Sequence, residues 1–466
     1  MNSKCDILLK SGILIDPINN FEGARDIGIK AGKIIAVAEG LRADDAEDVF
    51  DVSGRYVMPG VVDMHAHMDG DFGYKMLAMA GVTTALDMAG PVDRIIEGSR
   101  DEGAGINVAT IDRLVANYNI QDHDPTNAQI QNALDKTMKK GSLGLKIMGG
   151  YHPLTPDATA RAIQVVNDNK AYIAYHAGTT KNGSEIDGFL EAAELAGNNC
   201  LHIAHINSYC RGLVRPYMTE TQEAINTLIA HPNLRSESYL SPMNGTMGFC
   251  ENGVPVSRIA RNCLLMGGYE PTERGLENAI LEGWAYINKR SGGGMVLSTG
   301  PEAGAFWKSM NTDAMVSFPV NPAQPRYWLA TAKRPDGSFV TDAISTDGGS
   351  IPRNVIISMG LSLVKMQALT MAEFVLKASI NPGRILGLTN RGHLGEGAEA
   401  DITVVDYDRQ QAYMTIVGGK PVMYNGYVYG RGGNFLTTSA GVENVKSYGL
   451  KPILIDISQS AFYLGL

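Results

Sequence analysis

The sequence lacks long apolar runs and local concentrations of charge of one sign. Its 466 residues carry 40 Lys and Arg against 49 Asp and Glu, for a formal net charge of −9, with the two signs mixed along the chain. No basic run indicates a surface for nucleic acid or for an anionic membrane. No stretch reaches the about 18 apolar residues that a membrane-spanning helix needs. Neither a nucleic acid nor a membrane is therefore expected as a partner.

Cysteine is also scarce. The five cysteines are scattered, odd in number and never spaced as CxxC. This spacing argues against a disulfide framework and against a cysteine zinc finger, and it fits a reducing compartment. The first residues, "MNSKCDILLKSGILIDP", lack the charged start and apolar core of a signal peptide. We therefore expect a cytoplasmic protein.

What is present is a large apolar fraction arranged in two patterns. Hydrophobic residues make up 44% of the chain and charged residues only 19%, enough for an extensive core. Residues 1–58 read as short strands separated by turns, as in a small β-sandwich. Residues 59–388 alternate eight strand-like runs with helix-like ones, which predicts a (β/α)8 barrel, although a doubly wound sheet has the same local pattern.

Two further segments complete the expected organisation. The interval at about 241–339 is too long for an ordinary crossover and is rich in Gly, Pro and Met, so we expect an insertion above the substrate-binding face of the barrel. After the barrel, "GHLGEGAEADITVVDYD" returns to strand-like alternation. Residues 389–466 are therefore expected to complete the sandwich and to end in a C-terminal tail.

Several residues that can bind metals stand at the ends of the predicted barrel strands. "DMHAH" places His65 and His67 two residues apart, so both imidazoles project from one face of a strand. "AYIAYHAG" and "LHIAHINS" end their apolar runs at His176 and His205, and "DAISTDGGS" ends with Asp347. Each residue alone is more typical of a structural role, but together they outline the catalytic rim of a barrel.

Three other residues of these segments have distinct expected roles. Lys146 lies inside the apolar run "SLGLKIMGGY", where an unpaired ammonium would be costly to bury. Gly348 follows Asp347 and is expected to leave space for a ligand. His202 shares a face with His205 but lies deeper in its strand, so we expect it in the core or behind the ligands.

Together with "VMPGVVDMHAH", "GVTTALDMA", "ASINPGRILGL" and "GHLGEGAEADITVVD", this ordered set resembles the amidohydrolase superfamily over almost the whole chain. Within it, Lys146 and Tyr151 match the hydantoinase, dihydropyrimidinase and dihydroorotase group. "GSLGLKIMGGYHPLTPDA" and "ESYLSPMNGT" are similar to the N-acyl-D-amino-acid deacylases, although that group usually lacks the lysine and uses a cysteine ligand not identified here. Gly348, Gly349 and Ser350 replace the His-Ala-Pro common in hydantoinases, and Thr179 stands where aromatic-base deaminases carry a glutamate.

The resemblance implies a centre of two divalent metal ions, zinc by preference, with manganese, iron, cobalt or nickel as alternatives. It implies that Lys146 takes up carbon dioxide as a carbamate that bridges the ions. It also implies that Asp347 acts as the proton acceptor and that Tyr151 binds the substrate and its developing oxyanion. The implied ligands are His65, His67 and Asp347 for the first ion, and His176 and His205 for the second.

The expected function is metal-dependent hydrolysis of a non-peptide C–N bond in a small-molecule amide, most simply a cyclic amide, imide or ureide. An N-acyl-amino-acid deacylase is the alternative, and its substrate carboxylate would need a cation. The insertion offers four such cations: Arg258, Arg261, Lys308 and Arg326. A non-catalytic scaffold on the same fold is disfavoured because every ligand position is filled. By resemblance, a homo-oligomer, dimer or tetramer, is expected.

Overall fold

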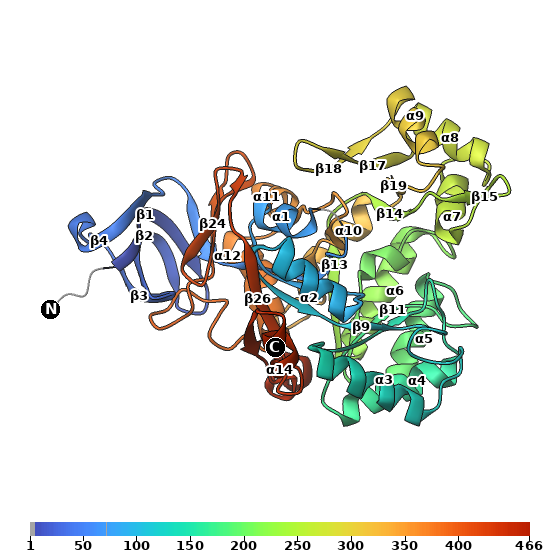
Figure 1. Ribbon diagram of the computed structural model, residues 1–466, viewed down its shortest axis with the longest axis horizontal. Helices are drawn as coiled ribbons and strands as arrows, with labels where there is room; N and C mark the ends of the chain where they lie inside the picture. The colour runs from blue at the N-terminus through green and yellow to red at the C-terminus, as the bar shows by residue number, and fades with distance from the viewer. Residues whose placement is uncertain (1–4, 71) are drawn as a thin grey trace.

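The computed structural model describes residues 5–70 and 72–466. A barrel of strands and helices forms the middle of the molecule, a β-sheet domain lies at one end, and an insertion projects from the other (Figure 1). Within the described residues, no helix is both long enough and apolar enough to cross a membrane.

The barrel strands pair in parallel in two sheets, which the chain itself joins at two points. Two of the eight positions are occupied by bent strands, whose halves pair with different neighbours. β8 pairs with β7 while β9 pairs with β10, and β20 pairs with β13 while β21 pairs with β6. The predicted (β/α)8 fold is thus confirmed. The strands are β6 (Val61–His67), β7 (Val82–Asp87), β8 (Ala104–Thr110), β9 (Asp112–Leu114), β10 (Gly144–Met148), β11 (Tyr172–His176), β12 (Leu201–Ile203), β13 (Leu234–Tyr239), β20 (Ala343–Ser345) and β21 (Gly348–Gly349).

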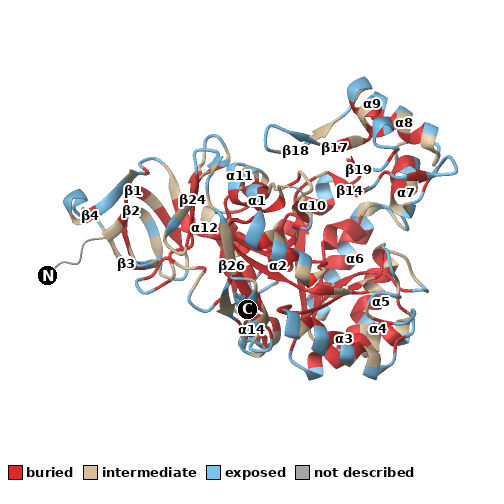
Figure 2. Ribbon diagram, in the orientation of Figure 1, coloured by how far each residue is buried: buried red, intermediate tan, exposed pale blue. Residues whose placement is uncertain are grey.

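Helices cover the outside of the ring, so the strands are buried on both faces (Figure 2). This explains why strands such as β7 and β11 are nearly continuous apolar runs rather than alternating ones. Local signals set the helix ends: Thr126 closes a capping box at the start of α3, and Gly141 ends that helix at φ 119°. The helices are α1 (Gly73–Met79), α2 (Val92–Asp101), α3 (Asn127–Lys140), α4 (Pro156–Asp168), α5 (Ile186–Ala196), α6 (Tyr217–Ala230), α10 (Ala323–Thr331), α11 (Ile356–Lys365), α12 (Met371–Val375) and α13 (Asn381–Ile385).

The second domain is a nine-stranded sheet built from both ends of the chain. The two parts join where β5 pairs antiparallel with β22, with Val57 opposite Val404. The long strand β1 pairs with both β4 and β5, and apolar side chains from both parts pack into one core. The strands are β1 (Cys5–Asp16), β2 (Phe21–Lys30), β3 (Lys33–Ala38), β4 (Ala46–Asp51), β5 (Tyr56–Pro59), β22 (Ile402–Asp406), β23 (Gln411–Val417), β24 (Lys420–Tyr424) and β25 (Tyr427–Val428).

The C-terminal tail leaves this sheet and returns to the barrel. β26 (Gly432–Thr437) pairs in parallel with β8, and β27 (Lys451–Leu454) pairs with β26. Phe435 and Leu436 are fully buried there, and this burial of apolar surface holds the tail against the barrel. Two short helices, α14 (Val442–Ser447) and α15 (Ala461–Leu464), complete the tail.

The insertion after β13 folds around a core of its own, centred on the buried Trp307 and Phe318. It is shorter than the range expected from the sequence, because α10 already packs on α6 and β13 as an ordinary barrel helix. Its hairpin β17–β18 reaches α1, where the Met295 amide donates to Met76 Sδ at 3.3 Å. The elements are β14 (Asn244–Met247), β15 (Cys250–Glu251), β16 (Val254–Pro255), α7 (Arg258–Met266), α8 (Glu273–Glu282), β17 (Tyr286–Ser291), β18 (Gly294–Ser298), α9 (Pro301–Ser309) and β19 (Met315–Phe318).

Candidate metal centre

The six side chains expected as metal ligands lie together at the carboxyl ends of the barrel strands. In a parallel barrel these ends meet at one mouth, which is why residues far apart in the sequence converge there. All except the half-buried His67 are buried. The six are His65, His67, Lys146, His176, His205 and Asp347.

The first part of the centre joins β6 to the end of β20. Asp347 Oδ1 lies 3.0 Å from His67 Nε2 and 3.3 Å from His65 Nε2. His65, His205 and Asp347 each offer a ligand atom, and these three atoms lie within 4.8 Å of one another. Two nitrogens and a carboxylate oxygen gathered this closely suit a divalent transition metal ion.

The second part joins β11 to the segment after β12. His176 Nδ1 lies 3.0 Å from His205 Nε2, and His176 Nε2 lies 2.8 Å from Ser184 Oγ. The ring of His176 needs the glycine at position 150, because a Cβ there would lie 2.3 Å from Nε2. The two imidazoles therefore present one nitrogen each to a common point.

Two of the ligand candidates have left-handed backbone conformations. His205 has φ 38° and Asp347 has φ 49°, both rare for residues other than glycine. Such conformations cost of order 1–3 kcal/mol and persist where the surroundings enforce them, frequently at functional sites. Here each turns the chain sharply after a short strand, which directs the side chain into the mouth.

Burial governs the ionisation of the three innermost histidines. It lowers the pKa of His176 to about 3 and lowers the pKa of His65 and of His205 well below their usual value, with the nearby Lys146 adding to the effect. The imidazoles are therefore neutral at pH 7, the form that binds metals. His205 Nδ1 has no hydrogen-bond partner among the described residues. This donor set fits a metal centre.

Lys146 is 1% exposed, and its Nζ lies 3.3 Å from His65 Nε2. Burial lowers the pKa of Lys146 to about 8, although the carboxylates of Asp347 and Glu237 oppose the shift. The side chain thus does not reach solvent, and a sizeable fraction of it is a neutral amine at slightly alkaline pH.

Two buried charged residues of the centre were missed from the sequence. Glu237, on β13, is completely buried with Oε1 2.6 Å from His65 Nδ1. Arg353 is 3% exposed, and its Nη2 lies 2.7 Å from Asp347 Oδ2. Although burial alone would raise it, the Arg353 guanidinium and the nearby histidines hold the pKa of Asp347 well below its usual range. The sequence carried little sign of either, because Glu237 lies in the polar strand segment "LRSESY" and Arg353 lies in a loop.

The remaining expected residues lie at the edge of the centre or behind it. Tyr151 is 45% exposed and packs edge-on against the His176 ring, with 5.3 Å between ring centroids. The space beside Gly348 is taken by protein, because a Cβ there would meet Asn354 Oδ1 at 2.6 Å. His202 is buried and forms a 2.7 Å hydrogen bond with the Tyr172 hydroxyl.

The four cations proposed from the insertion are engaged elsewhere or exposed. Lys308 pairs with Glu273 and Glu277, Arg326 binds backbone carbonyls that include Asn321 O, Arg261 binds backbone carbonyls of its own segment, and Arg258 is exposed. Arg211, which follows β12, is instead the partly exposed guanidinium that acts electrostatically on His176 and Tyr151. A substrate carboxylate would find this cation nearer to the centre.

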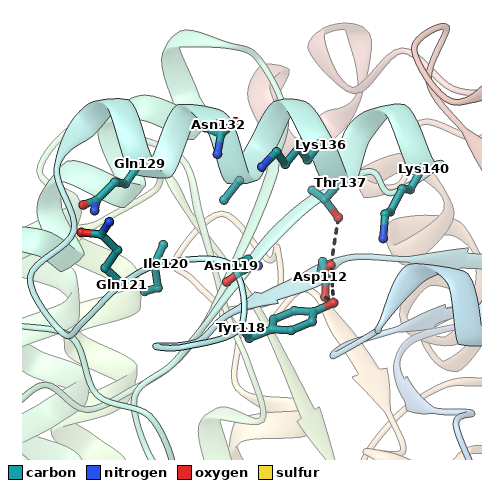
Figure 3. A pocket seen from close by; sticks show the side chains of 11 residues that line it. Asp112, Tyr118, Asn119, Ile120, Gln121, Gln129, Asn132, Lys136, Thr137 and Lys140 are labelled. Carbon is teal, nitrogen blue, oxygen red and sulfur yellow. Dashed lines mark hydrogen bonds between the residues drawn. The ribbon is translucent and has the colours of Figure 1, made fainter.

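A polar groove of about 400 Å³ lies between α3 and the segment that follows β9 (Figure 3). Its lining contains none of the residues expected at the metal centre. Asp112, at its floor, accepts hydrogen bonds from Thr137 at 3.2 Å and from the Tyr118 hydroxyl at 3.2 Å. These contacts fasten α3 to the barrel, which gives Asp112 a structural role.

The chain is similar to several known proteins. Residues 329–431 match the model of the Amidohydrolase family. The dihydroorotase of Elusimicrobium minutum (strain Pei191) is 25% identical over 433 residues, which cover 87% of this chain and 89% of that protein. A solved structure of D-aminoacylase, which addresses the functional role of its binuclear metal center, aligns with this chain with a TM-score of 0.64 at 16% identity. The alignment covers 92% of this chain and 99% of the D-aminoacylase chain.

A structure of D-hydantoinase has a TM-score of 0.60 at 17% identity and covers 92% of this chain and 98% of its own. At these identities the structural likeness establishes the shared fold, and the dihydroorotase match extends over most of the sequence. Together the comparisons confirm the resemblance to the amidohydrolase superfamily, and with it the prediction of a hydrolase of carbon–nitrogen bonds other than peptide bonds.

Proposed function

We propose that this chain is a binuclear metal-dependent hydrolase of a cyclic amide, imide or ureide. The observation that carries the proposal is the convergence of four histidines, one lysine and one aspartate at the mouth of the barrel. The likeness to dihydroorotases over most of both chains, together with the buried lysine, favours a ring as the substrate over an open chain.

The ligands divide between two ions. His65, His67 and Asp347 would hold one, and His176 with His205 the other. The neutral amine of Lys146 would add to carbon dioxide, losing one proton and gaining a carboxylate that would serve as a further ligand. Nitrogen and oxygen ligands without thiolate suit zinc, with manganese, iron, cobalt or nickel as alternatives. When bound, such ions lower the pKa of water and polarise a carbonyl oxygen.

Asp347 and Tyr151 would carry the proton transfer and the binding of the substrate. Because Arg353 holds Oδ2 of Asp347, the other oxygen faces the centre and would accept the proton of the attacking water. Passing that proton to the departing nitrogen makes the amine a better leaving group. Tyr151, at the rim beside His176, would donate a hydrogen bond to the carbonyl oxygen as negative charge develops there.

The second candidate is deacylation of an N-acyl amino acid. The observation in its favour is Arg211, whose guanidinium is held by Asn321 Oδ1 at 2.8 Å and by Asn244 Oδ1 at 3.1 Å. A cation fixed in this way beside the mouth would bind the free carboxylate of such a substrate.

The setting of the enzyme is also proposed. Five free cysteines suit a reducing cytoplasm, and the superfamily resemblance favours a homo-oligomer, dimer or tetramer.

The test is metal content and hydrolysis by the purified protein, grown with zinc or manganese, against hydantoins, dihydropyrimidines and N-acyl amino acids. We expect two metal equivalents per chain and turnover of a ring. His205→Asn should lose metal and activity, while His231→Asn, at the end of α6, should keep both. Turnover of N-acyl amino acids alone would select the deacylase, and wild-type protein without bound metal would contradict both candidates.

A further inference from the structure

We propose that Glu237 is a positioning residue that holds both halves of the metal centre, by fixing the tautomer of His65 and the backbone of His205. The inference rests on the proposed metal centre but concerns a residue that supplies no ligand. Glu237 lies at the middle of β13, which is separated from β6 by the single barrel position of β20 and β21, and is completely buried.

The contact with His65 determines which ring nitrogen can bind metal. Glu237 Oε1 lies 2.6 Å from His65 Nδ1, and a carboxylate only accepts hydrogen bonds, so the imidazole carries its proton on Nδ1. Nε2 is then left with a lone pair. This nitrogen lies 3.3 Å from Lys146 Nζ and 3.3 Å from Asp347 Oδ1, on the side where the other ligand atoms gather.

The contact with His205 acts through the main chain. The His205 amide donates to the same oxygen, Glu237 Oε1, at 2.6 Å. His205 has φ 38°, a conformation that costs energy unless neighbouring groups enforce it. A charge-assisted hydrogen bond to the amide is such a constraint, and it directs the ring toward His176, 3.0 Å away.

Glu237 is itself fixed by a third contact. The Ser345 hydroxyl, on β20, donates to Oε2, which leaves Oε1 for the two histidines. Glu237 therefore joins β6, the segment after β12, and β20 by hydrogen bonds beneath the ligands. Because Glu237 contacts both halves of the centre, its loss should weaken the binding of both metal ions. The loss of a single ligand should instead weaken mainly the binding of one ion.

Two variants separate the role of the hydrogen bonds from that of the charge. Glu237→Met has a similar length but no acceptor, and we expect its metal affinity to fall about 10- to 100-fold, the range for such supporting groups. Glu237→Gln keeps an acceptor oxygen and should restore part of the loss. The matched control is Asp342→Asn, because Asp342 is another buried acid, which accepts the Ser236 amide at 2.7 Å but contacts none of the ligands.

Metal affinity is measured by competition with a chelator, and the His65 tautomer by ¹⁵N-edited NMR of the metal-free protein. The proposal predicts that His65 carries its proton on Nδ1 in the wild type and that this preference is lost in Glu237→Met. It also predicts that Asp342→Asn binds metal with near-normal affinity. Wild-type affinity in Glu237→Met, equal loss in Asp342→Asn, or an Nε2–H tautomer in the wild type would each overturn it. If Glu237→Met does not fold, Glu237→Gln and the wild-type tautomer decide. A wild type that binds no metal would contradict the proposed function, while the tautomer still tests Glu237.

Discussion

Replacing Lys146 should affect stability and metal binding in opposite directions. Burial lowers the pKa of Lys146 from 10.5 to about 8, so its protonated form is disfavoured in the folded protein by about 3 kcal/mol at pH 7. Lys146→Met removes this cost and fills similar volume. We therefore expect the metal-free variant to unfold with a free energy about 3 kcal/mol higher than the metal-free wild type, while its metal content falls from two equivalents to one or none.

The pH dependence has a defined sign. A lysine with a depressed pKa destabilises the fold most below that pKa, and the cost disappears as pH rises toward the value of the unfolded chain. The advantage of Lys146→Met should thus shrink to about 1 kcal/mol near pH 10, as measured by urea denaturation in the presence of a chelator.

Lys377→Met is the matched control, because burial lowers the pKa of this second buried lysine to about 7. Its Nζ donates to Thr341 O, away from the ligands, so its metal content should not change. A metal-free Lys146→Met less stable than the wild type, or one that keeps both ions, would refute the reasoning.

Three further results are expected. Arg353→Met should lower the free energy of unfolding by about 3–5 kcal/mol in urea, because it leaves Asp347 as a buried charge without its partner; an unchanged value would contradict the pairing. Tyr151→Phe should lower kcat by about 100-fold with little change in KM, if its hydroxyl stabilises the developing oxyanion. Steady-state rates on the best ring substrate give both constants, and an effect that falls on KM instead of kcat would contradict this role. Arg211→Met should raise KM for N-acyl amino acids while leaving that for uncharged rings unchanged, and a uniform effect would exclude the carboxylate contact.

The barrel could be predicted because its signals are local. Most barrel strands are short, largely apolar runs, and the spacing of His65 and His67 alone places both rings on one face. Glu237 and Arg353 escaped because their meaning depends on partners: residue 237 acts on residue 65, which is 172 positions away. A lone acid in "NLRSESYLS" does not reveal whether it faces the ring interior or the helices.

The tail was harder to place for a similar reason. The segment "NFLT" is typical of a strand. Its pairing with β8, however, depends on the edge of β8 that no barrel strand occupies. The bend between β8 and β9 depends on how the two sheets of the barrel meet, which no short stretch of sequence encodes.

Arg353 also links the insertion to the chemistry. Its Nη1 donates to Met243 O at 3.1 Å, at the stem of the insertion, while its Nη2 holds Asp347. The stem therefore cannot shift without releasing a hydrogen bond of the guanidinium that holds this carboxylate. Substitutions in these first residues of the stem should therefore disturb the position of the Asp347 carboxylate, although they lie outside the barrel.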